Sequence, residues 1–235
     1  MTPLTVGICR EKAPGEKRVA LVPGLVGAAR TLGLGVLLES GAGASAGMPD
    51  RLYRETGAGV TTREELLARC DVLAGVRPPV LPAGCRFRRG QVLIALLDPL
   101  SIPFQVRRWA DEGLTTIGLD LAPTARVAAD PMDAAASPDR IGNVEGVRPE
   151  STSTAGPGVT VIGAGRLAAH SPRAASTVYA RNVTAVLERI VRDGRLRIDP
   201  ADPVLAVMVV THGGLVLHRA VWQLILDQTA LAGLP

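Results

Sequence analysis

The sequence predicts an α/β fold with a mostly parallel sheet and helices on both faces. Three observations support this prediction. Short β-rich runs alternate with stretches of helical spacing through the first 120 residues, as in repeated strand–helix units. Two of these runs are apolar throughout, which is typical of strands covered on both faces. With 235 residues, 47% of them hydrophobic, the chain is long enough to bury one large core.

The expected strands of the first half are short runs of β-branched and aliphatic residues. They are Thr5–Cys9, Val36–Leu38, Val72–Val76, Val92–Leu96 and Thr115–Leu119. Since these strands alternate with helical stretches at this spacing, the connections favour parallel pairing.

The helices between them carry recognisable ends. Apolar spacing predicts a helix over Gly24–Leu32, with Gly33 as its stop. Thr62 to Glu65 reads as a capping box that begins a further helix. Ser101 is expected to cap a helix that runs to about Glu112.

The composition changes after residue 137. Pro138–Pro157 is rich in Pro, Gly, Ser, Thr and Glu with almost no apolar periodicity, so it predicts a linker or surface loop. Order is expected to resume with a strand at Val159–Ile162, a long helix at Ala174–Arg192, a strand pair at Val204–Val210 and Leu215–Leu217 around Gly213-Gly214, and a helix at Ala220–Leu231.

Composition excludes several classes of protein. The net charge is +4, but the basic residues are scattered and aromatics are only 3%, which argues against nucleic-acid binding. Three distant cysteines with no metal-ligand spacing indicate small buried residues in a reducing compartment. No apolar run approaches the roughly 18 residues of a membrane span, and no secretory signal is evident. A soluble cytoplasmic protein without direct membrane insertion is expected.

One motif invites two interpretations. The run from Val159 through Gly163 and Gly165 to Ala168 has the form of a dinucleotide fingerprint, a strand followed by G-x-G-x-x-A. That motif needs a helix from the second glycine onward, and Pro172 falls where its second turn would be. An ordinary glycine-rich turn is the favoured interpretation, and nucleotide binding at this loop is the alternative.

Several motifs resemble the alpha subunit of NAD(P) transhydrogenase and its relative alanine dehydrogenase. In the first half they are Gly7–Glu11, Gly15–Pro23, Leu38–Gly43, Val76–Pro79, Leu97–Pro99, Leu119–Pro123 and Met132–Ala134. In the second half they are Gly158–Gly163, Ala175–Asn182, Asp193-Gly194 and Val210–Gly214. Pro78-Pro79 and Asp98-Pro99 favour the transhydrogenase branch.

The resemblance implies a domain organisation. Residues 1–137 correspond to the N-terminal part of a flavodoxin-like split subdomain, and residues 158–235 are expected to complete it. In the family an NAD-binding Rossmann subdomain is inserted between these parts. Here residues 138–157 stand in its place as a linker, so the chain is expected to supply one wall of a dinucleotide cleft.

The resemblance also implies site residues. The nicotinamide-facing loop of the family corresponds to Pro123–Ser137, so NAD contacts are expected from five residues: Arg126, Asp130, Pro131, Met132 and Asp133. Of these, Asp133 matches the family in both type and place. Arg18 stands where alanine dehydrogenase holds the substrate carboxylate, whereas that enzyme's lysine corresponds to Gly75 and no histidine lies near Leu96. Alanine dehydrogenase activity is therefore not expected.

Two functions from different classes follow. The first is a transhydrogenase component that takes part in hydride transfer between NAD(H) and NADP(H), coupled to proton translocation. It would be inactive alone and would act with membrane and NADP-binding subunits, as a homodimer by resemblance. The second is a non-catalytic interaction module, or a degenerate remnant that keeps the fold without the activity.

Overall fold

The structure is a computed structural model that describes residues 3–122, 152–154, 160–162, 167–199 and 201–232. An eight-stranded sheet runs through it in the order β12-β11-β6-β5-β4-β1-β2-β3. Its strands are β1 Thr5–Ile8, β2 Gly35–Glu39, β3 Gly59–Thr61, β4 Val72–Ala74, β5 Val92–Ala95, β6 Thr115–Gly118, β11 Val209–His212 and β12 Leu215–Val216. All neighbouring pairs from β3 to β6 are parallel, which confirms the predicted mostly parallel sheet.

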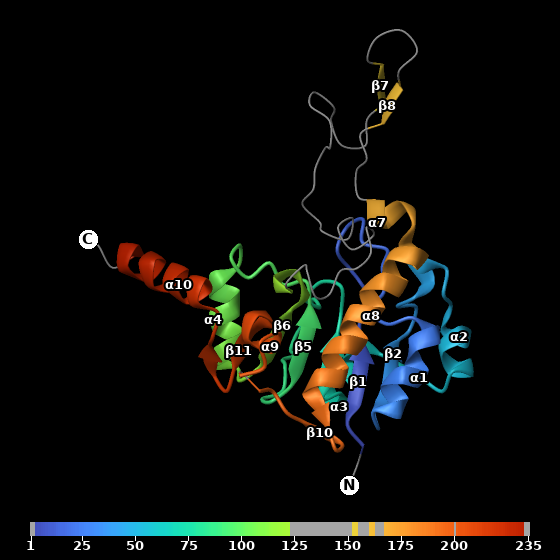
Figure 1. The fold of residues 1–235 in the computed structure, drawn as a ribbon, viewed down its shortest axis with the longest axis horizontal. Helices are drawn as coiled ribbons and strands as arrows, with labels where there is room; N and C mark the ends of the chain where they lie inside the picture. Colours follow the sequence, from blue (N-terminus) through green and yellow to red (C-terminus); the bar gives the residue numbers. More distant parts are fainter. Residues whose placement is uncertain (1–2, 123–151, 155–159, 163–166, 200, 233–235) are drawn as a thin grey trace.

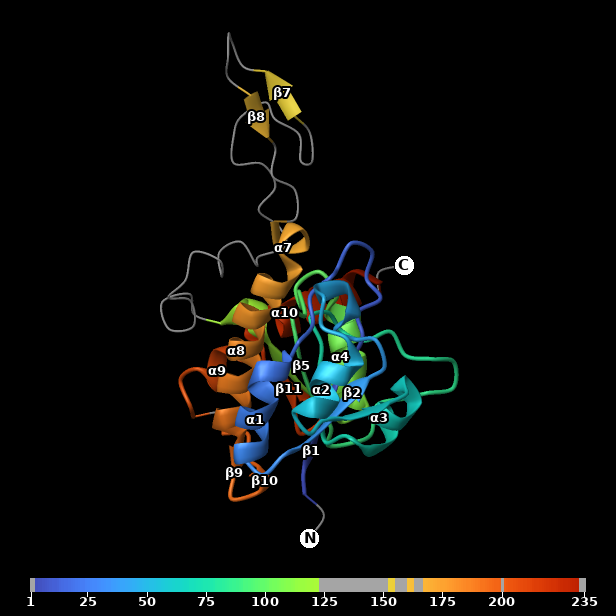
Figure 2. The same cartoon turned by 90° about the vertical axis from the view of Figure 1, so that its right-hand side faces the viewer.

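Helices cover both faces of the sheet, as expected (Figure 1). The described helices of the first half are α1 Pro23–Thr31, α2 Asp50–Glu55, α3 Arg63–Arg69 and α4 Pro103–Asp111, with 3-10 turns at Ala44–Ala46 and Leu119–Leu121. Those of the second half are α7 Leu167–His170, α8 Pro172–Ile190, α9 Leu205–Met208 and α10 Arg219–Ala232. Figure 2 shows α1 and α8 together on one side of the sheet, with α3 on the other.

Alternating strand residues divide the core in two. Ile8, Val36 and Ile94 belong to the cluster under α1 and α8, whereas Leu73 and Leu93 belong to the cluster under α3, α4 and α10. Every residue of β4, β5 and β6 is buried. These strands are covered on both faces because each face has its own helical layer.

Several expected helix ends are confirmed. Gly33 follows α1 with φ +79° and its N–H donates to the Arg30 carbonyl, the left-handed stop that glycine favours. The Thr62 hydroxyl accepts from the Glu65 N–H at 3.3 Å and caps α3. The second bond of a capping box, from the Thr62 N–H to the Glu65 carboxylate, is not found among these described residues. The Glu65 carboxylate accepts from the Thr61 hydroxyl instead.

Other expectations require correction. Ser101 does not cap α4: the N-cap is Ile102, without a side-chain bond, and Pro103 opens the helix. The expected strand over Val204–Val210 is wrong in its first half, where α9 precedes β11. Asp202 begins that helix because its Oδ1 accepts from the Val204 and Leu205 N–H groups. Helix α2 and strand β3 were not predicted from the sequence.

The C-terminal segment is largely as expected. Helix α8 occupies nearly all of the predicted range. Strands β11 and β12 pair antiparallel around Gly213 and Gly214, whose φ values of 59° and 85° suit a two-residue hairpin. Two short antiparallel pairs lie outside the main sheet: β9 Val191–Arg192 with β10 Arg195–Leu196, and β7 Thr152–Thr154 with β8 Thr160–Ile162. Strand β7 thus falls inside the range predicted as a linker.

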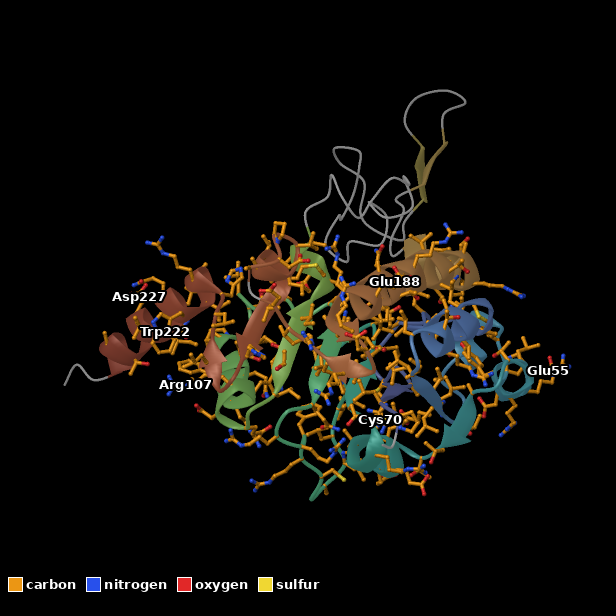
Figure 3. All side chains as sticks on the ribbon, turned by 60° about the horizontal axis from the view of Figure 1, so that its bottom comes forward. Glu55, Cys70, Arg107, Glu188, Trp222 and Asp227 are labelled. Carbon is orange, nitrogen blue, oxygen red and sulfur yellow. The ribbon has the colours of Figure 1, made fainter. Side chains whose placement is uncertain are left out.

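Helices α4 and α10 pack together at the end of the sheet that β11 and β12 form. Strands β11 and β12 lie beside β6, where α10 packs on α4. Figure 3 shows Arg107 of α4 and Trp222 of α10 close together, at the end of the molecule opposite Glu55. The Arg107 guanidinium carbon lies 5.6 Å from the centre of the Trp222 ring, a cation–π contact that joins the two helices.

Candidate functional site

The strand order places a crevice at the carboxyl ends of β1 and β4. From β1 the parallel strands continue in one direction through β2 to β3 and in the other through β4 to β6. Ligands of open α/β sheets bind where the order reverses in this way, because the loops leaving the two central strands diverge. Here those loops are residues 9–22, after β1, and 75–91, after β4.

Glu11, in the first of these loops, holds the beginning of the second. Its Oε1 accepts from the Val76 N–H at 2.6 Å and its Oε2 from the Arg77 N–H at 3.2 Å. Burial raises the pKa of Glu11 to about 7, although the two hydrogen bonds and Arg18 favour the carboxylate. The two successive N–H groups therefore form an oxyanion nest that the chain's own carboxylate fills.

Arg18 is buried at the same edge with only 3% of its surface exposed. Its Nε and Nη2 donate to the two oxygens of Glu16 at 2.8 and 2.7 Å, a bidentate pair. Burial opposes the charged form of Glu16, yet the hydrogen bonds and charge of Arg18 hold the pKa of Glu16 below its usual value. The guanidinium also lies 5.7 Å from the centre of the Tyr179 ring.

Helix α8 brings the C-terminal segment to this edge. The Tyr179 hydroxyl donates to the Gly75 carbonyl at 2.8 Å, and burial raises the pKa of Tyr179 well above its usual value. One turn earlier, the Ser176 hydroxyl accepts from the Val19 N–H at 3.0 Å and donates to the Pro172 carbonyl. The loops after β1 and β4 are therefore both fixed by one helix that lies more than 150 residues away from Val19 in the sequence.

Gly75 occupies a place where no side chain fits. A Cβ atom there would lie 2.6 Å from the Arg77 carbonyl oxygen and 3.4 Å from Glu11 Oε1. The first distance is far below van der Waals contact with a backbone atom that cannot turn aside. A lysine at this position, the one that the resemblance assigns to alanine dehydrogenase, would require the backbone after β4 to move.

A second acidic residue organises the neighbouring strand ends. Asp120 follows β6, and its two carboxylate oxygens accept from the Leu97 and Asp98 N–H groups at 2.9 and 2.8 Å. Asp98 has φ +46°, an unusual value for a residue other than glycine. The chain reaches residue 122 at this same carboxyl edge.

A cavity of about 160 Å³ lies beside Glu11. Its described lining comes from the two diverging loops and from α3: Cys9, Arg10, Glu11, Lys12, Ala13, Pro14, Arg63, Arg77, Pro78, Pro79 and Val80. Arg63 supports one wall, since its guanidinium donates to both Glu39 oxygens, to the Val80 carbonyl and to the Arg10 carbonyl. This crevice at the carboxyl ends of β1 and β4, the switch point of the sheet, therefore contains a cavity as well as charged side chains.

The residues expected to contact NAD lie outside the described part of the chain. These are Arg126, Asp130, Pro131, Met132 and Asp133, all within 123–151. The described residues that meet at the switch point are others. Glu11, Glu16 and Tyr179 were not predicted as site residues, although each lies inside a motif quoted for the family resemblance.

The glycine motif at 163–165 does not have the surroundings of a dinucleotide fingerprint. Strand β8, which precedes it, pairs antiparallel with β7 and not within the parallel sheet. A fingerprint glycine turn follows a strand of a βαβ unit and opens a helix that faces the phosphates. Helix α7, which follows, has only four residues, and α8 begins anew at Pro172.

Residues 7–131 match the family described as "Alanine dehydrogenase/PNT, N-terminal domain", and residues 132–219 match "Alanine dehydrogenase/PNT, C-terminal domain". The chain belongs to the alanine dehydrogenase/PNT family. This finding confirms the resemblance that the motifs indicated.

Relatives within the family carry both names. The chain is 32% identical over 147 residues to NAD(P) transhydrogenase subunit alpha of Cereibacter sphaeroides, covering 62% of this chain and 27% of that protein. It is 28% identical over 123 residues to alanine dehydrogenase of Bacillus subtilis, covering 52% of this chain and 32% of that protein. The chain therefore matches about a third or less of the length of these relatives.

Solved structures show the same fold. A transhydrogenase from Sinorhizobium meliloti superposes with a TM-score of 0.71 at 20% identity, covering 92% of this chain and 99% of that one. An L-alanine dehydrogenase superposes with a TM-score of 0.68 at 15% identity, covering 95% and 99%. At these identities the likeness concerns the fold alone.

Two kinds of feature are absent from the described residues. No described helix is long and apolar enough to cross a membrane. Among the same residues, no group of three or more His, Cys, Asp or Glu side chains is placed to hold a metal ion. Cys9 and Cys70 are buried and Cys85 is half-buried, and all three are free.

Proposed function

We propose that this member of the alanine dehydrogenase/PNT family is a transhydrogenase alpha-subunit-like protein that supplies one wall of an NAD-binding cleft. In this proposal residues 1–137 and 158–235 form one split domain, and residues 138–157 replace the NAD-binding insert of the family. The wall is the carboxyl edge of β1, β4, β5 and β6, together with the loop that holds Arg126 and Asp130–Asp133.

The packing at Gly75 carries this proposal. The family includes two activities, and Gly75 disfavours one of them because its Cβ position lies 2.6 Å from the Arg77 carbonyl oxygen. The neighbouring Arg18, the other residue expected to hold an amino-acid carboxylate, already forms a bidentate pair with Glu16. An amino-acid substrate would have to displace a buried carboxylate and would meet no lysine.

The described residues do not fit a dinucleotide by themselves. A pyrophosphate needs a glycine turn directly between a strand and a helix N-terminus. Residues 9–22, the connection from β1 to α1, do not form such a turn, and Glu11 already fills the nest at Val76 and Arg77. NAD chemistry is hydride transfer by the nicotinamide, to which this chain would contribute orientation only. We therefore assign the chain no reaction of its own.

The proposal includes partners. Hydride transfer between NAD(H) and NADP(H), with proton translocation, would need the NADP-binding and membrane subunits that family members named as transhydrogenase subunits work with. A homodimer and a location on the cytoplasmic side of the membrane belong to the same proposal.

Titration of the purified chain with NADH tests the proposal. Saturable binding in the micromolar range, followed by NADH fluorescence, would support the NAD-binding role, and Asp133→Ala should then weaken that binding. Asp139→Ala, a matched change in residues 138–157, should bind as the unchanged protein does. No binding up to millimolar NADH would contradict an NAD-binding role.

One observation favours a second candidate, the non-catalytic interaction module. The charged groups best placed for a ligand at the switch point are bonded within the chain: Glu11 to two backbone amides, and Arg18 to Glu16. Such an edge is stable without a ligand. The same titration separates the two candidates, because the module binds no NADH at any concentration.

A further inference from the structure

The cavity beside Glu11 is surrounded by unequal numbers of positive and negative charges. Five charged side chains are among the described residues that line it: Arg10, Glu11, Lys12, Arg63 and Arg77. Glu11 is the single carboxylate of this set. Arg63 is neutralised by Glu39, whose oxygens lie 2.8–3.1 Å from its nitrogens.

The remaining three cations have no such partner in the part of the chain that the structure describes. The side chains of Arg10, Lys12 and Arg77 form no hydrogen bond or ion pair with another described residue. Arg77 lies near enough to Glu16 to lower the pKa of that carboxyl, but both Glu16 oxygens already bind Arg18. Lys12 likewise helps to lower the pKa of Glu64, without an ion pair to it, and Glu64 does not line the cavity. Among the described residues that line the cavity, three positive charges against one negative charge leave a net charge of two.

The size and the walls of the cavity define what fits. Its volume of about 160 Å³ is close to the ~150 Å³ cavity that accommodates a benzene-sized molecule. A tetrahedral oxyanion of five heavy atoms is within that limit. Pro14, Pro78 and Pro79 form part of the wall. Their fixed φ angles reduce the loop ordering that binding would otherwise require.

The position in the fold agrees with a ligand site. The cavity lies at the carboxyl ends of β1 and β4, where α/β sheets bind their ligands. Cations that line a partly enclosed site attract anions more strongly than isolated surface cations do, because water screens them less.

We propose that this cavity is an oxyanion site that takes a doubly charged tetrahedral group, a sulfate or a phosphate, with Arg77 and Lys12 as its principal cations. The phosphate is either the free ion or the end group of a small phosphate monoester. This proposal does not depend on the proposed contacts of Arg126 and Asp130–Asp133 with NAD.

Calorimetric titration of the full chain at pH 8 and low salt tests this site. The probes are sodium sulfate, inorganic phosphate and glycerol phosphate, and saturable binding of at least one is expected. Equal affinity for all three indicates a site for the free ion, whereas tighter glycerol phosphate binding indicates a monoester. Absence of saturable binding with every probe overturns the proposal.

Four variants locate the binding. Lys12→Gln and Arg77→Gln should each weaken sulfate binding about fivefold, the effect of losing one partly exposed ion pair. Glu11→Gln should strengthen it by a similar factor because it removes the one lining carboxylate. Lys17→Gln is the matched control, since Lys17 is exposed in the same loop but does not line the cavity. An equal loss of sulfate affinity in Lys17→Gln and Lys12→Gln would show that sulfate responds only to the overall charge of the protein, and it would refute the site.

Two further comparisons separate loss of the site from misfolding and from loss of NADH binding. Lys12 is exposed, so its variant tests the site even where Arg77→Gln alters the loop, and circular dichroism compares the folds. Sulfate binding without NADH binding would leave this site standing and remove the proposed NAD role. NADH binding without sulfate binding would do the reverse.

Discussion

The Tyr179 hydroxyl donates a hydrogen bond to the Gly75 carbonyl oxygen at 2.8 Å, across 104 residues of sequence. Both groups are buried, so neither has water as an alternative partner. The bond joins α8 to the end of β4 at the switch point. Through it, the C-terminal segment determines the position of a loop that the N-terminal segment supplies.

Replacing Tyr179 with Phe should therefore lower the free energy of unfolding. The change leaves the Gly75 carbonyl buried without its partner, which costs about 1–3 kcal/mol. Urea unfolding followed by circular dichroism measures it. Thr177→Ala is the control, because half-buried Thr177 on the same helix bonds only the Arg173 carbonyl one turn back, and its loss should change stability by less than about 0.5 kcal/mol. Equal stabilities for Tyr179→Phe and the unchanged protein would show that the bond contributes nothing.

Gly75→Ala tests the crowding after β4. Its Cβ would meet the Arg77 carbonyl oxygen at 2.6 Å, so the backbone must shift at a cost of about 1–3 kcal/mol. Gly27→Ala is the matched control: it lies within α1 with nothing within 4 Å of its Cβ position, and alanine there should stabilise the helix by about 0.5–1 kcal/mol. Thermal melts of the two variants should move in opposite directions. A Gly75→Ala protein that melts at the unchanged temperature contradicts the packing described here.

Glu11 should make stability depend on pH near neutrality. Its pKa is about 7 in the folded chain and 4.5 in the unfolded chain, so the folded state holds the proton more tightly. The free energy of unfolding should therefore decrease from pH 5 to pH 7 and level off above, by on the order of 2–3 kcal/mol.

The comparison that isolates this effect is Glu11→Gln, which keeps an acceptor oxygen but cannot titrate. The difference in unfolding free energy between the two proteins should change across pH 5–7 with the sign just given. A constant difference over that range would mean that Glu11 titrates at its ordinary value. Denaturant unfolding at several pH values supplies the measurement.

Arg63 should be the most sensitive of the charged residues at the cavity. It is 4% exposed, and Arg63→Gln would leave two backbone carbonyls without the Arg63 donor and Glu39 with the Arg10 N–H alone. Removing one partner of such a buried pair costs about 3–5 kcal/mol. Arg108→Gln breaks an exposed pair with Glu112 and should cost about 0–1 kcal/mol. Similar midpoints of urea unfolding for both variants would contradict a buried role for Arg63.

The alternation of apolar runs and helical stretches was enough to predict the class of fold. Runs such as Val92–Leu96 indicate burial on both faces, and Gly33 and Thr62 mark helix ends through local bonds that need no tertiary contact. The same local logic failed at Val204–Val210. Its β-branched residues favour a strand, but a short helix begins there, with the Asp202 carboxylate accepting from the Val204 and Leu205 N–H groups, and the strand begins only at Val209.

The candidate site, like the fold, could be predicted from the sequence only in part. Family motifs in the sequence placed Glu11, Glu16, Arg18 and Tyr179 in segments that resemble known relatives, because a motif is a local pattern of residue types. Their roles required the folded chain. The sequence by itself determined most strands of the main sheet, some helix ends and the family; only the tertiary structure decided that Glu11 binds the amides of Val76 and Arg77 and that Tyr179 reaches Gly75. The physical reason is distance along the chain: partners 65 to 104 residues apart meet through packing of the sheet and α8, which no local propensity encodes.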